Sequence, residues 1–189
     1  MVTSVNRTTV APMAIVVMGV SGSGKSTLGA LLAARLGCSF VEGDAFHDAA
    51  AIAMMRSGQP LGDDDRWPWL DRIGTALAAE VSANGVAVVA CSALKRVYRD
   101  RLAGCVSVPL RFMLLDADSD TLRERLSERA DHYMPPSLLA SQLAILERPA
   151  VDEAALTLDT ATPPETLAHI ALKWLAFPAA ALPLPRSRA

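Results

Sequence analysis

Short apolar runs alternate with longer stretches of mixed apolar and polar residues along most of the chain. The short runs are rich in β-branched residues, which is typical of strands buried on both faces of a parallel sheet. They predict strands at residues 14–18, 39–42, 86–90, 110–115 and 155–158. The mixed stretches predict helices at residues 27–36, 48–56, 65–83, 94–102, 118–129, 137–147 and 164–174. This alternation predicts a three-layer α/β fold, with about five parallel strands flanked by helices.

Composition places these elements in one domain. The chain has 189 residues, of which 51% are hydrophobic and 20% are charged, so it can bury a sizeable core and is not disordered as a whole. We expect a single domain over residues 13–177, between a flexible leader at residues 1–12 and a flexible Ala/Pro-rich tail at residues 178–189. The leader lacks the apolar stretch of a signal peptide, and no apolar run approaches the roughly 20 residues of a membrane helix. We therefore expect a cytoplasmic protein that binds no membrane.

Charge and cysteine content disfavour two further classes of protein. Eighteen basic and twenty acidic residues give a net charge of −2, which disfavours a broad electrostatic grip on nucleic acid but still allows a local basic pocket. Cys38, Cys91 and Cys105 are odd in number and show no C-x-x-C spacing, which disfavours a disulfide framework or a zinc site. We expect all three to be reduced thiols.

The segment after the first predicted strand fits the phosphate-binding pattern G-x-x-x-x-G-K-[ST] in full. It spans residues 19–26 and lies between a predicted strand and a predicted helix, which is the context that the pattern requires. Backbone N–H groups of such a loop and of the helix N-terminus bind phosphate oxygens. Lys25 would reach the β- and γ-phosphates of ATP, and the Ser26 hydroxyl would ligate Mg²⁺. The predicted nucleotide-binding residues are Gly19, Val20, Ser21, Gly22, Ser23, Gly24, Lys25, Ser26 and Thr27.

Acidic residues lie at the end of the second predicted strand. Glu42 and Asp44 lie two residues apart, so on a continuing strand they share a face, toward the crevice at the carboxyl ends of the strands. Asp44 is the candidate to orient or deprotonate an acceptor hydroxyl, and either carboxylate could hold a metal-bound water. His47 could bond the same substrate. The alternatives are a solvated acidic turn and a helix-capping or surface histidine.

Basic residues occur at two further places. Arg66 lies within an acidic stretch, and its planar guanidinium suits a bidentate bond to a carboxylate. The neighbouring Trp67 and Trp69 favour core packing over a stacking platform. Lys95 and Arg99 follow the strand at residues 86–90, where they would balance an anionic substrate and the transferred phosphoryl group. A solvent-exposed basic face is the alternative for this pair.

Arginine residues also precede a predicted break between helices. Arg125 and Arg129 are four residues apart on one helix face, just before the break at about residues 130–136. A flexible segment that carries arginine can close over phosphates as a mobile lid. Both arginines are therefore candidate catalytic cations, and His132 lies within the predicted lid.

Together, these segments resemble the thermoresistant-type gluconokinase family, whose members are P-loop kinases related in fold to adenylate and shikimate kinases. The resemblance covers about residues 15–172, and its segments at residues 55–69 and 91–100 are long and specific. The matching segments are Gly-Val-Ser-Gly-Ser-Gly-Lys-Ser at 19–26, Gly-Asp-x-x-His at 43–47, Met-x-Ser-Gly-x-Pro-Leu-x-Asp-Asp-Asp-Arg-x-Pro-Trp at 55–69, Cys-Ser-Ala-Leu-Lys-x-x-Tyr-Arg-Asp at 91–100 and Arg-x-x-x-Arg-x-x-His at 125–132.

The resemblance implies ATP-dependent phosphorylation of D-gluconate to 6-phospho-D-gluconate, which feeds the pentose phosphate or Entner–Doudoroff pathway. It also implies a P-loop NTPase fold like that of nucleoside monophosphate kinases, with ATP and Mg²⁺ as cofactors, in a cytoplasmic homodimer. The substrate-binding residues that it implies are Asp44, His47, Arg66, Lys95, Arg99 and His132. The catalytic residues that it implies are Lys25, Asp44, Arg125 and Arg129.

The chain departs from the family pattern after His47. Ala51 stands where the family has an Asn-like residue, and Met54 stands where it has a Lys-like residue. The predicted lid reads Ala-Asp-His-Tyr at residues 130–133, where the family usually has Lys-Gly-His-Phe. If the missing polar groups contact substrate, affinity for gluconate or selectivity is altered; if they are surface groups, nothing follows.

Two other functions stay open at this point. One is a kinase of the same fold with another acceptor, such as shikimate or a nucleoside monophosphate. The other is a nucleotide-dependent switch or binding module without metabolic turnover. The sequence has no N-K-x-D guanine-reading motif, which argues against a GTPase switch.

Overall fold

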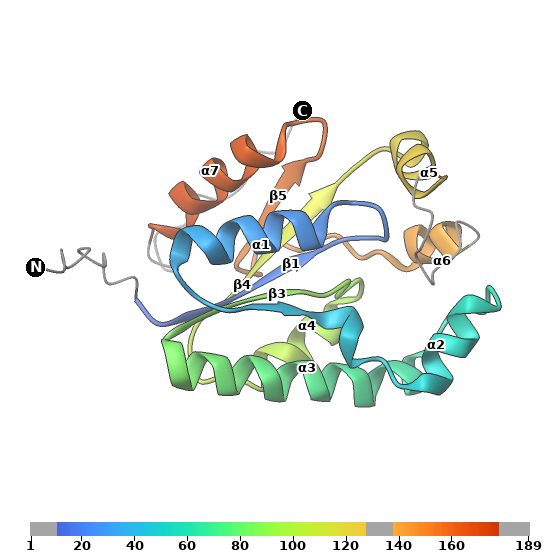
Figure 1. The fold of residues 1–189 in the computed structure, drawn as a ribbon, viewed down its shortest axis with the longest axis horizontal. Coiled ribbons are helices and arrows are strands. Elements are labelled where there is room, and N and C mark those ends of the chain that lie inside the picture. Colours follow the sequence, from blue (N-terminus) through green and yellow to red (C-terminus); the bar gives the residue numbers. More distant parts are fainter. Residues whose placement is uncertain (1–10, 128–137, 178–189) are drawn as a thin grey trace, which may run out of the picture.

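Strands that are apolar on both faces lie inside the sheet. In the computed structural model, which describes residues 11–127 and 138–177, every residue of β1 (Met13–Met18) and β3 (Val86–Ala90) is buried. The sheet is completed by β2 (Phe40–Glu42), β4 (Leu110–Asp116) and β5 (Ala155–Asp159). The strands are parallel and follow the order β2-β3-β1-β4-β5 (Figure 1).

Helices cover both faces of this sheet. α1 (Lys25–Leu36) and α7 (Pro164–Leu175) lie on one face, and α3 (Asp63–Asn84) and α4 (Arg96–Ala103) lie on the other (Figure 1). Alternate side chains of β1 therefore enter different cores, since Val16 packs in the cluster that contains α3, and Ile15 packs in the cluster that contains α1 and α7. The predicted three-layer fold with five parallel strands is confirmed.

The carboxyl ends of the strands face a separate group of short helices. These are α2 (Ala49–Arg56), α5 (Ser119–Ser127) and α6 (Leu138–Ile145), which lie beyond the sheet in Figure 1. Between β2 and α2 the chain forms a 3₁₀ turn, η1 (Gly43–Phe46). The predicted Arg129, His132 and lid residues 130–136 lie outside the described residues, as do almost all of the predicted leader and the predicted tail.

The start of α3 differs from the prediction. The sequence places a helix cap at Asp65, whereas α3 begins at Asp63 with Gly62 as its N-cap residue. Asp65 is the third residue of the helix, and its Oδ2 accepts a hydrogen bond from the backbone N–H of Gly62 at 2.8 Å. Three carboxylates in the first turn are favourable next to the positive end of the helix dipole, so the acidic run starts the helix instead of preceding it.

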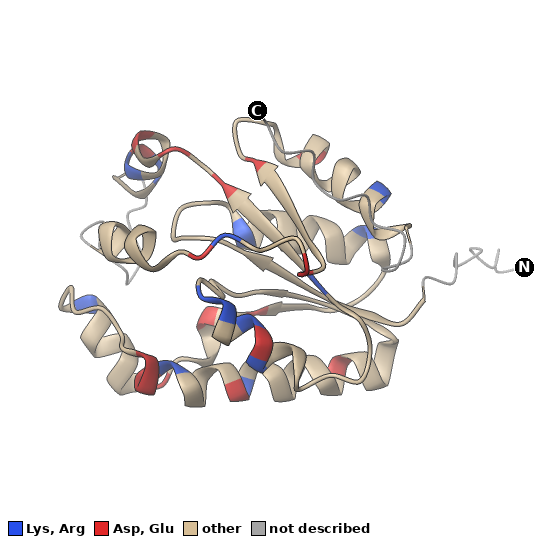
Figure 2. Cartoon of the chain, turned by 180° about the vertical axis from the view of Figure 1, so that it is seen from behind, with Lys and Arg blue, Asp and Glu red and all other residues tan. Residues whose placement is uncertain are grey.

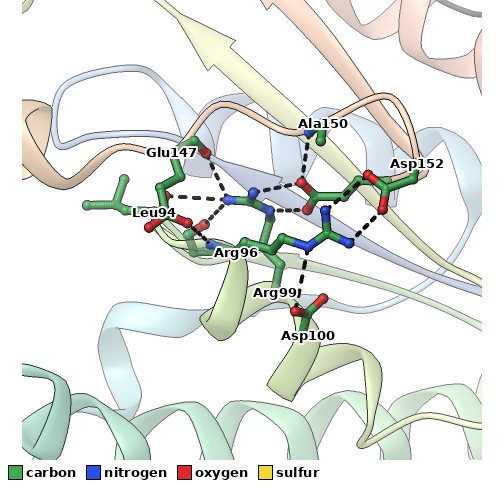
Figure 3. Close-up of polar contacts among 9 residues, drawn as sticks. Leu94, Arg96, Arg99, Asp100, Glu147, Ala150 and Asp152 are labelled. Atoms are coloured by element: carbon green, nitrogen blue, oxygen red, sulfur yellow. Dashed lines mark hydrogen bonds and ion pairs between the residues drawn. The ribbon is translucent and has the colours of Figure 1, made fainter.

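A buried arginine joins the turn after β3 to the chain segment after α6. The Arg99 side chain is 1% exposed and pairs with the Glu153 carboxylate, at 2.5 Å from Nε and 2.9 Å from the terminal nitrogen (Figure 3). Its other terminal nitrogen donates to the carbonyl oxygens of Ala93, Leu94 and Glu147, at 3.2, 3.4 and 3.0 Å. We call Arg99 with these partners the Arg99 clamp.

The Arg99 clamp supports a strained turn. Ala93 has a φ of 44°, a left-handed conformation that a residue with a Cβ adopts only when its surroundings enforce it. The backbone N–H of Glu147 donates to Leu94 at 2.8 Å, and the Glu147 carboxylate accepts from the backbone N–H of Arg96 at 2.7 Å (Figure 3). Charge pairing and backbone bonds together hold the turn after β3 against the segment after α6.

Both α3 and α4 carry acidic and basic residues, and the two helices pack against each other (Figure 2). There Arg101 of α4 forms two hydrogen bonds with Asp71 of α3, at 2.6 and 2.8 Å.

The three cysteines are free, and burial raises the pKa of the Cys91 thiol to about 12. Within the described ranges, no helix is both long and apolar enough to cross a membrane.

We expect a large loss of stability when the Arg99 side chain is truncated. Arg99→Ala leaves the buried Glu153 carboxylate without its partner, and breaking a buried ion pair in this way costs about 3–5 kcal/mol. Urea denaturation should show a loss of this size in the free energy of unfolding. Arg123→Ala is the control, because Arg123 pairs with Asp120 on the surface and such pairs contribute about 0–1 kcal/mol. Equal losses in the two variants would contradict a stabilising clamp.

Candidate active site

The loop between β1 and α1 has the backbone of a phosphate cradle. Gly19, Gly22 and Gly24 all have positive φ, and a Cβ on Gly19 would lie 2.9 Å from the Leu115 carbonyl oxygen, so no larger residue fits there. Lys25 folds back over the loop, and its Nζ donates to the Val20 carbonyl oxygen at 3.0 Å. Because α1 begins at Lys25 with no side-chain cap, its first backbone N–H groups face the same loop.

Two cavities meet at this phosphate loop. The first, which we call the polar cavity, is lined by Ser21, Lys25, Asp44, His47, Met55, Leu61, Arg66, Trp69, Ser92, Leu138, Ser141 and Gln142. The second, which we call the loop cavity, measures about 480 Å³ and is lined by Gly22, Ser23, Gly24, Thr27, Leu28, Leu115, Arg125, Thr160, Thr162, Pro164 and Leu167. A ligand phosphate bound in the loop would therefore border both cavities.

The loop cavity suits a nucleoside. Its volume lies in the range of small-molecule sites, and its walls combine apolar side chains with a few polar groups. Arg125 enters it from α5 and donates to the Thr160 carbonyl oxygen at 3.1 Å. The Thr160 hydroxyl is buried and has no hydrogen-bond partner within the described part of the chain, so it is placed to bond a ligand.

In the polar cavity, Asp44 and His47 are positioned by the turn η1. Gly43 passes so close to β3 that a Cβ on it would lie 2.3 Å from the Ala90 carbonyl oxygen. Helix α3 fixes the turn from the other side, since the indole Nε1 of Trp69 donates to the Gly43 carbonyl oxygen at 2.8 Å. Trp69 thus belongs to the core, as the sequence suggests, and also holds the backbone that carries Asp44.

The carboxylates of Glu42, the last residue of β2, and of Asp44 do not share a strand face. The expected extended segment ends at Glu42, and the tight turn that follows directs Asp44 into the polar cavity, whereas Glu42 is not among the lining residues. The expectation of a paired carboxylate site was therefore wrong in its geometry. It rested on strand periodicity, which does not extend through a 3₁₀ turn.

The His47 imidazole is half-buried beside Trp69. Its ring stacks on Trp69 with 4.4 Å between ring centroids and an interplanar angle of 9°. Its Nδ1 is buried without a hydrogen-bond partner among the described residues. Burial lowers the pKa of His47 below its ordinary value of 6.5, with the nearby Arg66 contributing to the shift, while Asp44 opposes it. The ring can therefore accept a hydrogen bond from a ligand at neutral pH.

Arg66 and Lys95 have different environments. Arg66 is only 8% exposed. Its side chain lines the polar cavity and donates two hydrogen bonds to the Leu61 carbonyl oxygen, both at 3.2 Å. Lys95 does not line this cavity, and its Nζ donates to both carboxylate oxygens of Asp63, at 2.6 and 2.9 Å. The Tyr98 hydroxyl donates to the same carboxylate at 2.5 Å. This pairing raises the pKa of Lys95 and lowers that of Asp63, against a smaller effect of burial.

The structure also corrects the reading of Arg99 as a substrate contact. Its guanidinium is buried in the Arg99 clamp and does not line the polar cavity, so it supports the turn after β3 instead of facing a ligand. The predicted Ser26 and Thr27 are exposed at the start of α1. Of the predicted acceptor residues, the structure brings together Asp44, His47 and Arg66 around Lys25.

Several lining residues were missed by sequence reasoning. Ser92 lies two residues after the end of β3, and the cations after it were chosen as site residues instead. Ser141 and Gln142 come from α6, which carries no motif that signals a site. The apolar wall includes Met55 and Leu61, which lie inside a segment quoted for the resemblance but have side chains typical of a core.

Comparison with known proteins agrees with this geometry. The model of a family described as an AAA domain matches residues 15–149. A gluconokinase of Gluconobacter oxydans (strain 621H) is 49% identical over 145 residues, which cover 77% of this chain and 81% of that protein. The thermosensitive gluconokinase of Escherichia coli (strain K12) is 44% identical over 138 residues, which cover 73% of each chain.

A solved structure extends the similarity to three dimensions. The crystal structure of a gluconokinase from Sinorhizobium meliloti 1021 has 46% sequence identity and a TM-score of 0.78, over 87% of this chain and 92% of that one. Identity of this size over most of the sequence accompanies a complete phosphate loop and a polar cavity that opens onto its lysine. The chain belongs to the gluconokinase family.

Proposed function

We propose that the protein transfers the γ-phosphoryl group of ATP to D-gluconate and releases 6-phospho-D-gluconate. The observation that carries this proposal is the polar cavity, in which Lys25 of the phosphate loop lies with a carboxylate, a neutral imidazole and a guanidinium. A polyhydroxy acid needs groups of these kinds, and the relatives named gluconokinase support gluconate as the acid. A homodimeric state and a cytoplasmic location remain predictions drawn from the resemblance.

The residues of the phosphate loop fit Mg²⁺–ATP. The glycines with positive φ let the loop curl around a phosphate, and the buried Ser23 hydroxyl has no partner among the described residues. Ser26 is exposed in the first turn of α1, where a hydroxyl can ligate Mg²⁺. No cluster of three or more His, Cys, Asp or Glu side chains in the described ranges could hold a metal by itself. We propose that the metal arrives with the nucleotide, where it neutralises phosphate charge.

On the acceptor side, Asp44 would orient or deprotonate the hydroxyl that attacks the phosphorus. His47 would accept a hydrogen bond from another hydroxyl through Nδ1, and Arg66 would pair with the gluconate carboxylate. Arg125 would bind the nucleotide in the loop cavity. Arg129 and His132 stay predicted lid residues. Rate enhancement would come mainly from positioning and from cations that neutralise charge on the transferred group.

The reaction is tested by following ADP formation from ATP and Mg²⁺ with gluconate, and in an otherwise identical mixture without it. We expect ADP to form in step with 6-phosphogluconate and only when gluconate is present. Shikimate and AMP replace gluconate in parallel mixtures, since they represent the other acceptors of this fold. Faster turnover with either of them, or equal ADP release without an acceptor, would contradict the proposed function.

Asp44→Asn tests the role of the carboxylate in the polar cavity. The amide keeps the size of the side chain but cannot accept a proton, so kcat should fall about 100-fold or more, whereas KM for gluconate should change little. Asp120→Asn is the matched control, because Asp120 is an exposed carboxylate on α5. A near-normal kcat in Asp44→Asn, measured by steady-state kinetics, would remove Asp44 from the chemical step.

Because partial burial lowers the pKa of His47, we expect the stability of the fold to depend on pH. Because its pKa is lowered by folding, the unfolded chain binds more protons below the ordinary value of 6.5, and protonation favours unfolding there. The contribution of His47 is therefore fully present above that value and is lost as the pH falls through the pKa of the folded state. Urea denaturation at about pH 7.5 and about pH 5.5 should show a larger loss for the wild-type protein than for His47→Gln. Equal losses would show that the imidazole is not held neutral by burial.

A further inference from the structure

A side chain from α6 reaches the backbone of the phosphate loop. The Oε1 atom of Gln142 accepts a hydrogen bond from the backbone N–H of Ser21 at 2.7 Å, across 121 residues of sequence. Both residues are 7% exposed, so water does not replace this bond. A buried backbone N–H that loses its acceptor is costly, and Gln142 therefore constrains the loop conformation.

The peptide unit between Val20 and Ser21 is held at both of its polar atoms. Its carbonyl oxygen accepts from the Lys25 ammonium at 3.0 Å, and its N–H donates to Gln142 at 2.7 Å. When the Lys25 side chain turns to a phosphate, its hydrogen bond to the Val20 carbonyl oxygen is lost. The bond to Gln142 does not involve Lys25, so it can keep the peptide oriented while the loop binds ATP.

Helix α6 is itself firmly supported. Leu139 packs in one apolar cluster with Val20, the residue before Ser21, and with Leu122 and Leu126 of α5. Beyond the C-terminal end of the helix, the Glu147 backbone donates to Leu94 and accepts from Arg99 in the Arg99 clamp. Gln142 thus extends from a fixed helix, and its amide can act as a fixed support for the loop.

We propose that Gln142 is a positioning residue for phosphoryl transfer. From the polar cavity, its side chain fixes the Val20–Ser21 peptide, so that the loop holds ATP in line with the acceptor. The inference rests on the proposed function, because it assigns this geometry to transfer from ATP. Gln142 acts through Ser21 and not on the reacting atoms. Its loss should weaken the nucleotide site, although the side chain lines the cavity of the acceptor.

Gln142→Met tests the proposal, because methionine keeps the length and packing of glutamine but offers no comparable acceptor. Calorimetry should give a Kd for a non-hydrolysable ATP analogue with Mg²⁺ that rises about tenfold, which corresponds to about 1.4 kcal/mol. The Kd for gluconate should change less than about twofold, and kcat should fall about 10-fold to 100-fold because a small misplacement is costly in a transfer reaction. Ala144→Met, on an exposed position of the same helix, should leave all three values unchanged.

Other outcomes overturn the proposal. A Kd that changes for gluconate alone would make Gln142 a simple acceptor contact, and a lower melting temperature with both Kd values unchanged would make it a packing residue. If Gln142→Met does not fold, Gln142→Asn withdraws the amide by one methylene and should show the same loss of nucleotide affinity. The analogue needs no acceptor, so its Kd tests Gln142 even if wild-type turnover with gluconate is absent, a result that would contradict the proposed function instead.

Discussion

The parallel register of three strands is the constraint on which the site depends. Ala90 of β3 is paired with Val17 of β1 on one side and with Glu42 of β2 on the other, so the three strands end at one level. The chain leaves each strand toward the same region, and the three exits become the phosphate loop, the turn η1 and the turn that carries Ser92. A sheet of this kind brings an anion cradle and an acidic group together without any long-range motif.

Around these exits, the structure holds unusual conformations with buried contacts. Gly43 lies too close to β3 for any side chain, and Trp69 bonds its carbonyl oxygen. Ala93 adopts a positive φ under a guanidinium that Glu153 neutralises. Strain at a site persists only when its surroundings determine it from several sides. In this chain those surroundings are α3, which holds the turn η1, and the Arg99 clamp, which holds the turn after β3.

Much of the fold could be predicted because burial leaves a direct mark on the sequence. β1 and β3 are apolar throughout since both of their faces are covered, and β3 was predicted to the residue. The phosphate loop could also be predicted, because all of its residues lie in one short segment of the sequence. Asp44 was selected because a carboxylate at a strand end points toward the ligand crevice. It lines the polar cavity, although the 3₁₀ turn that directs it there was not foreseen.

The remaining features depend on contacts between distant segments. Nothing beside Arg99 in the sequence shows that Glu153, 54 residues later, neutralises it, so an arginine near the site was read as a substrate contact. Lys95 was read in the same way, although Asp63 and Tyr98 occupy its charge in this structure. Gln142 bonds a loop 121 residues away, and no spacing rule reports such a pair. Tertiary contacts decide which charged and polar residues serve the site.

We propose that one continuous site, in which both cavities border the phosphate loop, holds nucleotide and acceptor together. A bisubstrate compound, in which adenosine is joined to the terminal oxygen of gluconate through a polyphosphate chain, tests it most directly by inhibition kinetics. If the two cavities share the loop, a compound of suitable length should compete with both ATP and gluconate and bind more tightly than either. Competition with ATP alone, with gluconate still binding normally, would show that the polar cavity is not the acceptor site.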